Sequence, residues 1–107
     1  MENKLQLMTE AIRKGLQAKR NPDLLTCGAG RAYVCLSSSE DRKTLNAFKK
    51  ACEANGLRYI GKAYGSGSRA AYVGYDNFDG KALSQAKAIE AELLEVGVKA
   101  YWDGVSD

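Results

Sequence analysis

The chain has 107 residues, of which 45% are hydrophobic and 27% charged, and its formal net charge is +3. This composition is ordinary for one soluble globular domain, and no apolar run approaches the roughly 20 residues that span a bilayer. The first residues include Glu2 and lack the apolar centre of a signal peptide. We therefore expect a cytoplasmic protein that makes no contact with a membrane.

The first predicted element is a helix over residues 4–19. Apolar residues recur in it at three- and four-residue spacing, which is the pattern of an amphipathic helix. They are Leu5, Met8, Ile12 and Leu16. The helix is expected to stop before Pro22, because the residue that precedes a proline disfavours the α region. Residues 21–30 then form a connector.

A strand and a second helix follow the connector. Residues 31–36 (RAYVCL) alternate in the manner of a strand. The spelling SSSE at residues 37–40 is that of a capping box, and it predicts that a helix begins there. Its buried stripe is expected to be Leu45, Phe48 and Cys52. The helix should end at Asn55-Gly56, since glycine commonly terminates helices.

The second half of the chain predicts two strands, a helix and a last strand. Residues 57–64 and 69–75 are strands joined as a hairpin by the glycine-rich turn at 65–68. Strict alternation places Ala71, Val73 and Tyr75 on one face of the later strand and Tyr72 on the other. Asp79 is the expected N-cap of the helix that follows. Its stripe is Ala82, Ala86, Ile89, Leu93 and Val96, and the last strand is 98–102.

After residue 30 the predicted order is therefore strand, helix, strand, strand, helix, strand. Right-handed crossovers turn this order into a four-stranded antiparallel sheet with both helices on one face. We predict an α+β, ferredoxin-like fold. It consists of an N-terminal amphipathic helix (1–20), a connector (21–30), the ferredoxin-like domain (31–103) and a tail (104–107). The extra N-terminal helix is expected either to cover the open face of the sheet or to pack on a sheet edge.

Aromatic and basic residues gather on the predicted hairpin and on the first strand. They are Arg31, Tyr33, Arg58, Lys62, Tyr64, Arg69 and Tyr72. Cationic side chains attract phosphate, and tyrosine rings accept stacked bases. Because the first and third strands are neighbours in this fold, Tyr33 and Tyr72 are expected side by side on the open face. If the N-terminal helix covers that face, the tyrosines are simply good strand residues.

Two short segments resemble the RNA-recognition-motif family, which stacks bases on aromatic residues of the first and third strands. AYVCL at 32–36 is similar to the first-strand motif, and RAAYVGY at 69–75 is similar to the end of the third-strand motif. The resemblance implies that Tyr33 and Tyr72 stack bases. Ala70 stands where that family has a second stacking aromatic, and the Lys/Arg-Gly start of its motif is absent.

Catalytic and metal chemistry find no support in the sequence. The chain has no histidine, and its three cysteines, Cys27, Cys35 and Cys52, form no CxxC pair. A zinc site would need all three thiolates and a carboxylate at poor spacing, and an odd number of cysteines excludes a complete disulfide framework. We expect no catalytic residues, metal or cofactor, and we expect Cys35 and Cys52 to be packed as small apolar residues.

These observations favour a non-catalytic binding protein. The leading hypothesis is an inhibitor or regulator that covers a surface of a nucleic-acid-handling protein with its basic hairpin. Small size and lack of motifs are shared with phage and mobile-element proteins such as inhibitors of CRISPR and of host defence. The alternative is an RRM-like domain that binds single-stranded RNA or DNA directly, which requires an open sheet face. A sheet-mediated homodimer and a small-ligand regulatory domain are also left open.

Overall fold

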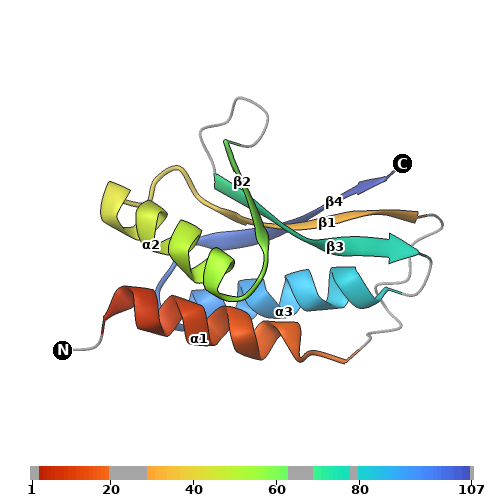
Figure 1. Cartoon of the computed structure of the whole chain (residues 1–107), viewed down its shortest axis with the longest axis horizontal. Coiled ribbons are helices and arrows are strands. Elements are labelled where there is room, and N and C mark those ends of the chain that lie inside the picture. Colours follow the sequence, from red (N-terminus) through yellow and green to blue (C-terminus); the bar gives the residue numbers. More distant parts are fainter. Residues whose placement is uncertain (1–2, 20–28, 63–68, 78–79, 107) are drawn as a thin grey trace.

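A computed structural model of the chain describes residues 3–19, 29–62, 69–77 and 80–106. Within these residues three helices lie on one side of a four-stranded antiparallel sheet (Figure 1), whose strand order is β2-β3-β1-β4. The elements are α1 (Lys4–Leu16), β1 (Ala29–Leu36), α2 (Arg42–Ala54), β2 (Arg58–Lys62), β3 (Arg69–Asn77), α3 (Lys81–Glu95) and β4 (Ala100–Ser106). The predicted α+β class and the antiparallel sheet are confirmed. None of the described helices is long and apolar enough to cross a membrane.

The extra helix α1 packs against α2 and α3, on the side of the molecule away from the free face of the sheet (Figure 1). Its side chains Met8 and Ile12 are fully buried and belong to the same apolar cluster as Val34 and Leu36 of β1. The periodic stripe was therefore correctly identified as buried. Both predicted docking places are wrong, because the apolar surface that this stripe meets is supplied by the other two helices.

The capping contact of α2 corrects the predicted start of this helix. α2 begins at Arg42, because Asp41 is its N-cap and accepts a hydrogen bond from the backbone N–H of Thr44 at 2.7 Å. The capping-box prediction at residues 37–40 is thus wrong, and the Ser37 hydroxyl bonds within its own turn to Ser39. The predicted end of this helix, with Gly56 at a φ of 76°, is confirmed.

The N-terminus of α3 is capped by Asp76, which lies outside the helix near the end of β3. The N-cap position is Gly80, which offers no side chain, and Asp76 accepts hydrogen bonds from the backbone N–H groups of Gly80 (2.8 Å) and Leu83 (3.2 Å). Asp79, the predicted cap, lies outside the described residues. Asp76 is 1% exposed, so these two bonds join the end of β3 to the first turn of α3 within the protein interior.

A β-bulge in β3 changes which of its side chains share a face. Ala32 and Tyr33 are neighbours in β1, yet their partners Gly74 and Tyr72 are two residues apart. Val73 is therefore an extra residue in β3. The bulge reverses the alternation of every residue that follows it in the strand.

As a result, Tyr75 lies on the same face as Tyr72. It pairs with Arg31, and Arg31 shares the face of Tyr33 because the two are two residues apart in β1. Strict alternation predicts Tyr75 on the face of Ala71. That prediction is wrong because the bulge inserts one residue between the two halves of the strand.

The end of the chain also differs from expectation. β4 runs over Ala100–Ser106, whereas the sequence predicts a strand over 98–102 and a tail from residue 104. The longer β4 extends the sheet and places Asp103 within a paired strand.

Cys35 and Cys52 are 2% and 0% exposed, so their predicted role as packed apolar residues is confirmed.

Candidate functional site

Tyr33 of β1 and Tyr72 of β3 lie together on the sheet face that is turned away from the helices. They are directly paired across the two strands, their ring centroids are 5.7 Å apart, and their planes meet at 67°. This is the edge-to-face geometry that aromatic pairs favour. Both side chains are half-buried, and none of the described helices lies over them (Figure 1). The prediction that they are neighbours on one face of the sheet is confirmed, and α1 does not cover that face.

One row of side chains crosses this face from edge to edge. Tyr72 is paired with Arg58 of the edge strand β2, and Tyr33 is paired with Asp103 of the other edge strand, β4. Arg58 and Asp103 are both exposed. Neighbouring strands lie about 4.8 Å apart, so three strand spacings separate the two charged residues by about 14 Å. The row has a cation at one edge, a carboxylate at the other, and two aromatic rings between them.

A second row of smaller side chains runs beside the first. Cys35 is paired with Ala70 and Tyr101, and Cys35 and Ala70 are both buried. Burial, and to a smaller extent the Asp103 carboxylate, raises the pKa of the Cys35 thiol to about 11, while a hydrogen bond with Tyr101 lowers it. Because only the thiolate is nucleophilic, Cys35 is inert at neutral pH and serves to fill the floor of this face.

Four of the seven predicted site residues are brought together on this face. They are Arg31, Tyr33, Arg58 and Tyr72. Arg69 is not among them, because it pairs with Leu36, whose side chain is in the core on the helical face. Its guanidinium also forms a hydrogen bond with Tyr59, which packs against that core. The side chain of Lys62 and the whole of Tyr64 lie outside the described residues.

Three residues of this face were missed in the sequence. Tyr75 and Tyr101 are 49% and 38% exposed, and Asp103 completes the row described above. Tyr75 was hidden by the bulge, although Gly74, directly after Val73, is a residue that often marks a bulge inside a strand. Tyr101 lies within the predicted last strand, and Asp103 continues its two-residue period, so extending that period past Trp102 would have found Asp103.

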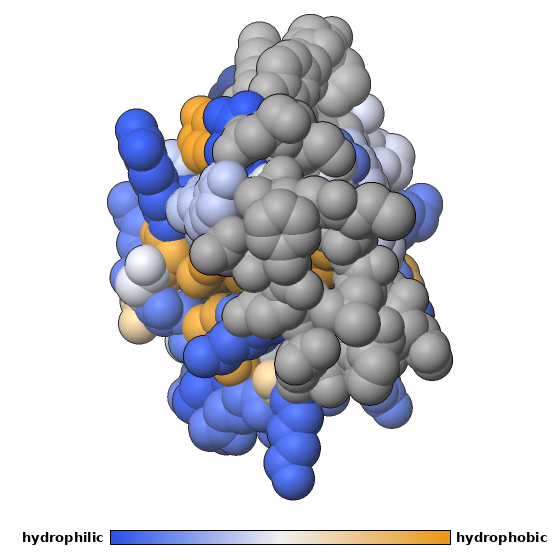
Figure 2. All heavy atoms as spheres, turned by 90° about the vertical axis from the view of Figure 1, so that its right-hand side faces the viewer, coloured by the Kyte–Doolittle hydropathy of each residue, from blue (hydrophilic) through white to orange (hydrophobic). Residues whose placement is uncertain are grey.

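A second charged surface lies on the outer sides of α1 and α2. The exposed basic residues of these helices are Lys4, Arg13, Lys14, Arg42, Lys43, Lys49 and Lys50. The exposed acidic residues on them and at the N-cap of α2 are Glu10, Asp41 and Glu53, which leaves four positive charges in excess. Figure 2, which views the end of the molecule away from α2, shows mostly hydrophilic side chains along its lower part. Charged side chains are mostly exposed in folded proteins, so a charged helix surface by itself does not indicate a binding site.

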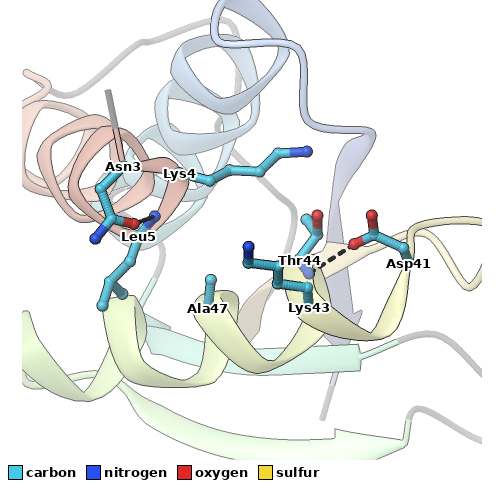
Figure 3. Close-up of a pocket in the computed structure, with 7 residues that line it drawn as sticks. All are labelled: Asn3, Lys4, Leu5, Asp41, Lys43, Thr44 and Ala47. Atoms are coloured by element: carbon cyan, nitrogen blue, oxygen red, sulfur yellow. Dashed lines mark hydrogen bonds between the residues drawn. The ribbon is translucent and has the colours of Figure 1, made fainter. Parts of the chain in front are cut away.

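A depression of about 460 Å³ lies between the first turns of α1 and α2 (Figure 3). Lys4 and Lys43 line it. One backbone N–H group in the first turn of each helix is already bonded to a capping side chain. Asn3 accepts from the N–H of Leu5 at 2.9 Å, and Asp41 accepts from the N–H of its own helix. Hydrogen bonds from Thr44, with smaller contributions from both lysines, lower the pKa of Asp41. An ionised carboxylate in this position disfavours an anionic ligand.

Among the residues that the structure describes, no three Cys, Asp or Glu side chains come together in a way that would hold a metal ion. The tyrosine row is thus the arrangement with the most specific chemistry, since it combines aromatic faces, a cation and an acceptor on one surface. No protein-family model, curated protein or solved structure matches this chain.

Proposed function

We propose that this chain is a single-stranded RNA- or DNA-binding domain of ferredoxin-like fold, which binds through the sheet face opposite its helices. The observation that carries the proposal is the position of α1 against α2 and α3, because it leaves the Tyr33–Tyr72 pair outside the helical layer. The strand order β2-β3-β1-β4, with the helices on one side, supports the ferredoxin-like assignment.

The row suggests a role for each of its first three residues. Tyr72 and Tyr33 offer aromatic faces or edges to successive bases, and each stacked base contributes about 1–3 kcal/mol to binding. Arg58 stands next to Tyr72 at the β2 edge and is exposed, so it is placed to contact a phosphate of the same strand. Bases in a duplex are paired and stacked on each other, which restricts this mode of binding to single strands.

The competing hypothesis, an inhibitor that covers a nucleic-acid-handling protein with its basic hairpin, has weaker support. This hypothesis includes Arg69 in the binding surface, yet Arg69 lies on the helical face of the sheet, beside Tyr59. Addition of a partner strand to the β4 edge is also opposed, because Glu90 of α3 already accepts the outward N–H of Trp102 at 3.1 Å. This hypothesis remains the alternative outcome of the experiment below.

The test is a fluorescence-anisotropy titration with labelled single-stranded RNA, single-stranded DNA and duplex DNA, each at low and at physiological salt. We expect saturable binding of single strands at physiological salt. Tyr72→Ala should weaken it by about 1–3 kcal/mol, which corresponds to roughly 5- to 150-fold, and Tyr72→Phe, which keeps the ring, should preserve it.

Absence of single-strand binding by the unmodified protein would overturn the proposal and favour a protein partner. Equal affinity for duplex and single strands, unaffected by Tyr72→Ala, would also overturn it, because it would indicate attraction by charge alone. Light scattering on the same samples reports whether the protein forms a homodimer, which would hide the tyrosines if it formed through this face.

A further inference from the structure

We propose that Asp103 selects guanine among the bases bound on this face, by accepting hydrogen bonds from the Watson–Crick edge of that base. The inference rests on the proposed single-strand binding and adds a base preference to it. It follows from the place of a carboxylate in a row that is otherwise suited to stacking and to phosphate contact.

Asp103 is directly paired with Tyr33 and exposed. The Cβ atoms of directly paired residues lie about 4.5–5.5 Å apart, so a base stacked on Tyr33 presents its edge within reach of this carboxylate. The carboxylate also acts on the thiol of Cys35, whose pKa it helps to raise. Cys35 lies two residues from Tyr33 on the same face of β1, so the charge of Asp103 reaches the neighbouring strand.

A carboxylate on a surface that binds a polyanion opposes binding unless it meets a hydrogen-bond donor. The phosphates are attracted to Arg58 at the opposite end of the row, about 14 Å away by three strand spacings. Arg31, which pairs with Val105 of β4, is a second exposed cation on this face and lies closer to Asp103. When a phosphate lies near Arg58 and two bases stack on Tyr72 and Tyr33, the edge of the base on Tyr33 lies beside Asp103. Specific single-strand recognition of this kind uses the Watson–Crick edges of unpaired bases.

Guanine has the edge that fits a carboxylate best. Its N1–H and N2–H₂ groups are adjacent donors, and they match the two acceptor oxygens of an ionised aspartate. Cytosine and adenine each offer one amine next to a ring acceptor. Uracil and thymine offer a single N3–H between two carbonyl oxygens, which repel the carboxylate. The expected order of preference at this position is guanine first, cytosine and adenine next, and uracil or thymine last.

The test compares a labelled uridine decamer with the same decamer carrying one central guanosine, by anisotropy at physiological salt. The uniform background lets the strand slide until the guanine reaches Asp103. We expect the guanosine decamer to bind about tenfold more tightly. Replacing the guanosine by inosine, which lacks the N2 amine, should remove most of that gain, and this probe needs no protein variant.

Asp103→Ala should abolish the difference between the two decamers, because alanine keeps no acceptor oxygen, whereas asparagine would keep one. It should also tighten binding of both, because it removes a negative charge from the face. Glu53→Gln, an exposed site on α2, makes the same change of charge away from the face and should leave the preference for guanosine intact.

Equal binding of the two decamers, or a preference that persists in Asp103→Ala, would overturn the inference and leave single-strand binding standing. No binding of either decamer would overturn the proposed function itself, and the inference with it.

Discussion

Gly15 of α1 lies directly against Ile89 of α3. A Cβ atom added at Gly15 would lie 2.7 Å from both the backbone N and the Cα of Ile89, so the two helices approach as closely as a residue without a side chain permits. Both residues are buried. This contact is one of those that place α1 in the helical layer, on the side of the sheet away from Tyr33 and Tyr72.

We expect Gly15→Ala to lower the free energy of unfolding by about 1–3 kcal/mol, because the new methyl group overpacks the contact with Ile89. Alanine favours a helix over glycine by about 1 kcal/mol, so a loss measured by urea denaturation would show that the contact outweighs propensity. Lys14→Ala, on the exposed side of the same turn, is the control and should change stability little. A Gly15→Ala protein more stable than the unmodified one would contradict the close approach of the two helices.

The buried carboxylate of Asp76 is expected to be important for stability rather than for binding. Asp76→Ala removes the acceptor for the N–H groups of Gly80 and Leu83, and a buried donor without a partner costs about 1–3 kcal/mol. Asp76→Asn keeps one acceptor oxygen and should lose less. Urea denaturation of both variants measures the difference. Equal stability of the alanine variant and the unmodified protein would show that the cap of α3 is dispensable.

The contribution of Arg58 should appear in the salt dependence of binding. Each phosphate that a protein neutralises on a single strand adds about −0.7 to the slope of log K against log salt concentration. Arg58→Ala should therefore flatten the slope by about 0.7. Lys50→Ala removes the same charge from the exposed side of α2 and should leave the slope unchanged. An unchanged slope in Arg58→Ala, together with a flatter slope in Lys50→Ala, would indicate that the phosphate contact lies on the helices and not on the sheet.

Cys52 should make stability depend on pH in the alkaline range. Burial, with a smaller effect of Glu53, raises the pKa of this thiol from 9.0 to about 12. Below pH 9 both the folded and the unfolded chain keep the proton, and the stabilisation is complete. Between pH 9 and about 12 only the unfolded chain ionises, so stability falls by about 1.4 kcal/mol per pH unit.

Urea denaturation at pH 8 and pH 10 under reducing conditions measures this loss. Tyrosines and lysines titrate in the same range, so the comparison is made with Cys52→Ala, which lacks the thiol. The unmodified protein should lose more stability than this variant between the two pH values. Equal losses would show that the thiol ionises as readily in the folded protein as in the unfolded chain.

The spacing of apolar residues in the sequence was sufficient to predict most helices and strands, because this spacing reflects which side chains are buried away from water. Met8 and Ile12 were identified as buried, and Tyr33 and Tyr72 as neighbours, from spacing and strand order alone. The docking of α1 could not be predicted in this way, since a stripe shows that a helix is buried but not what buries it. The contact at Gly15 depends on the crossing of two helices, which no local pattern contains.

The prediction of the candidate site missed Tyr75, Tyr101 and Asp103. The bulge at Val73 was not predicted, although Gly74 beside it is a residue that often marks a bulge in a strand, and without the bulge Tyr75 is assigned to the wrong face. Asp103 was lost because the last strand was ended at Trp102, where polar residues begin. Polar residues at a sheet edge are compatible with pairing, and β4 continues through them to Ser106.

The most direct test of the tyrosine face as the binding surface is an NMR titration of the ¹⁵N-labelled protein with the guanosine-containing decamer at physiological salt. We expect the amide shifts to change most along β1 and β3, around Tyr33 and Tyr72, and at Arg58, while α1 and α2 stay nearly unchanged. Changes confined to the basic surface of α1 and α2, with β1 and β3 unaffected, would contradict the assignment of the sheet face as the binding surface.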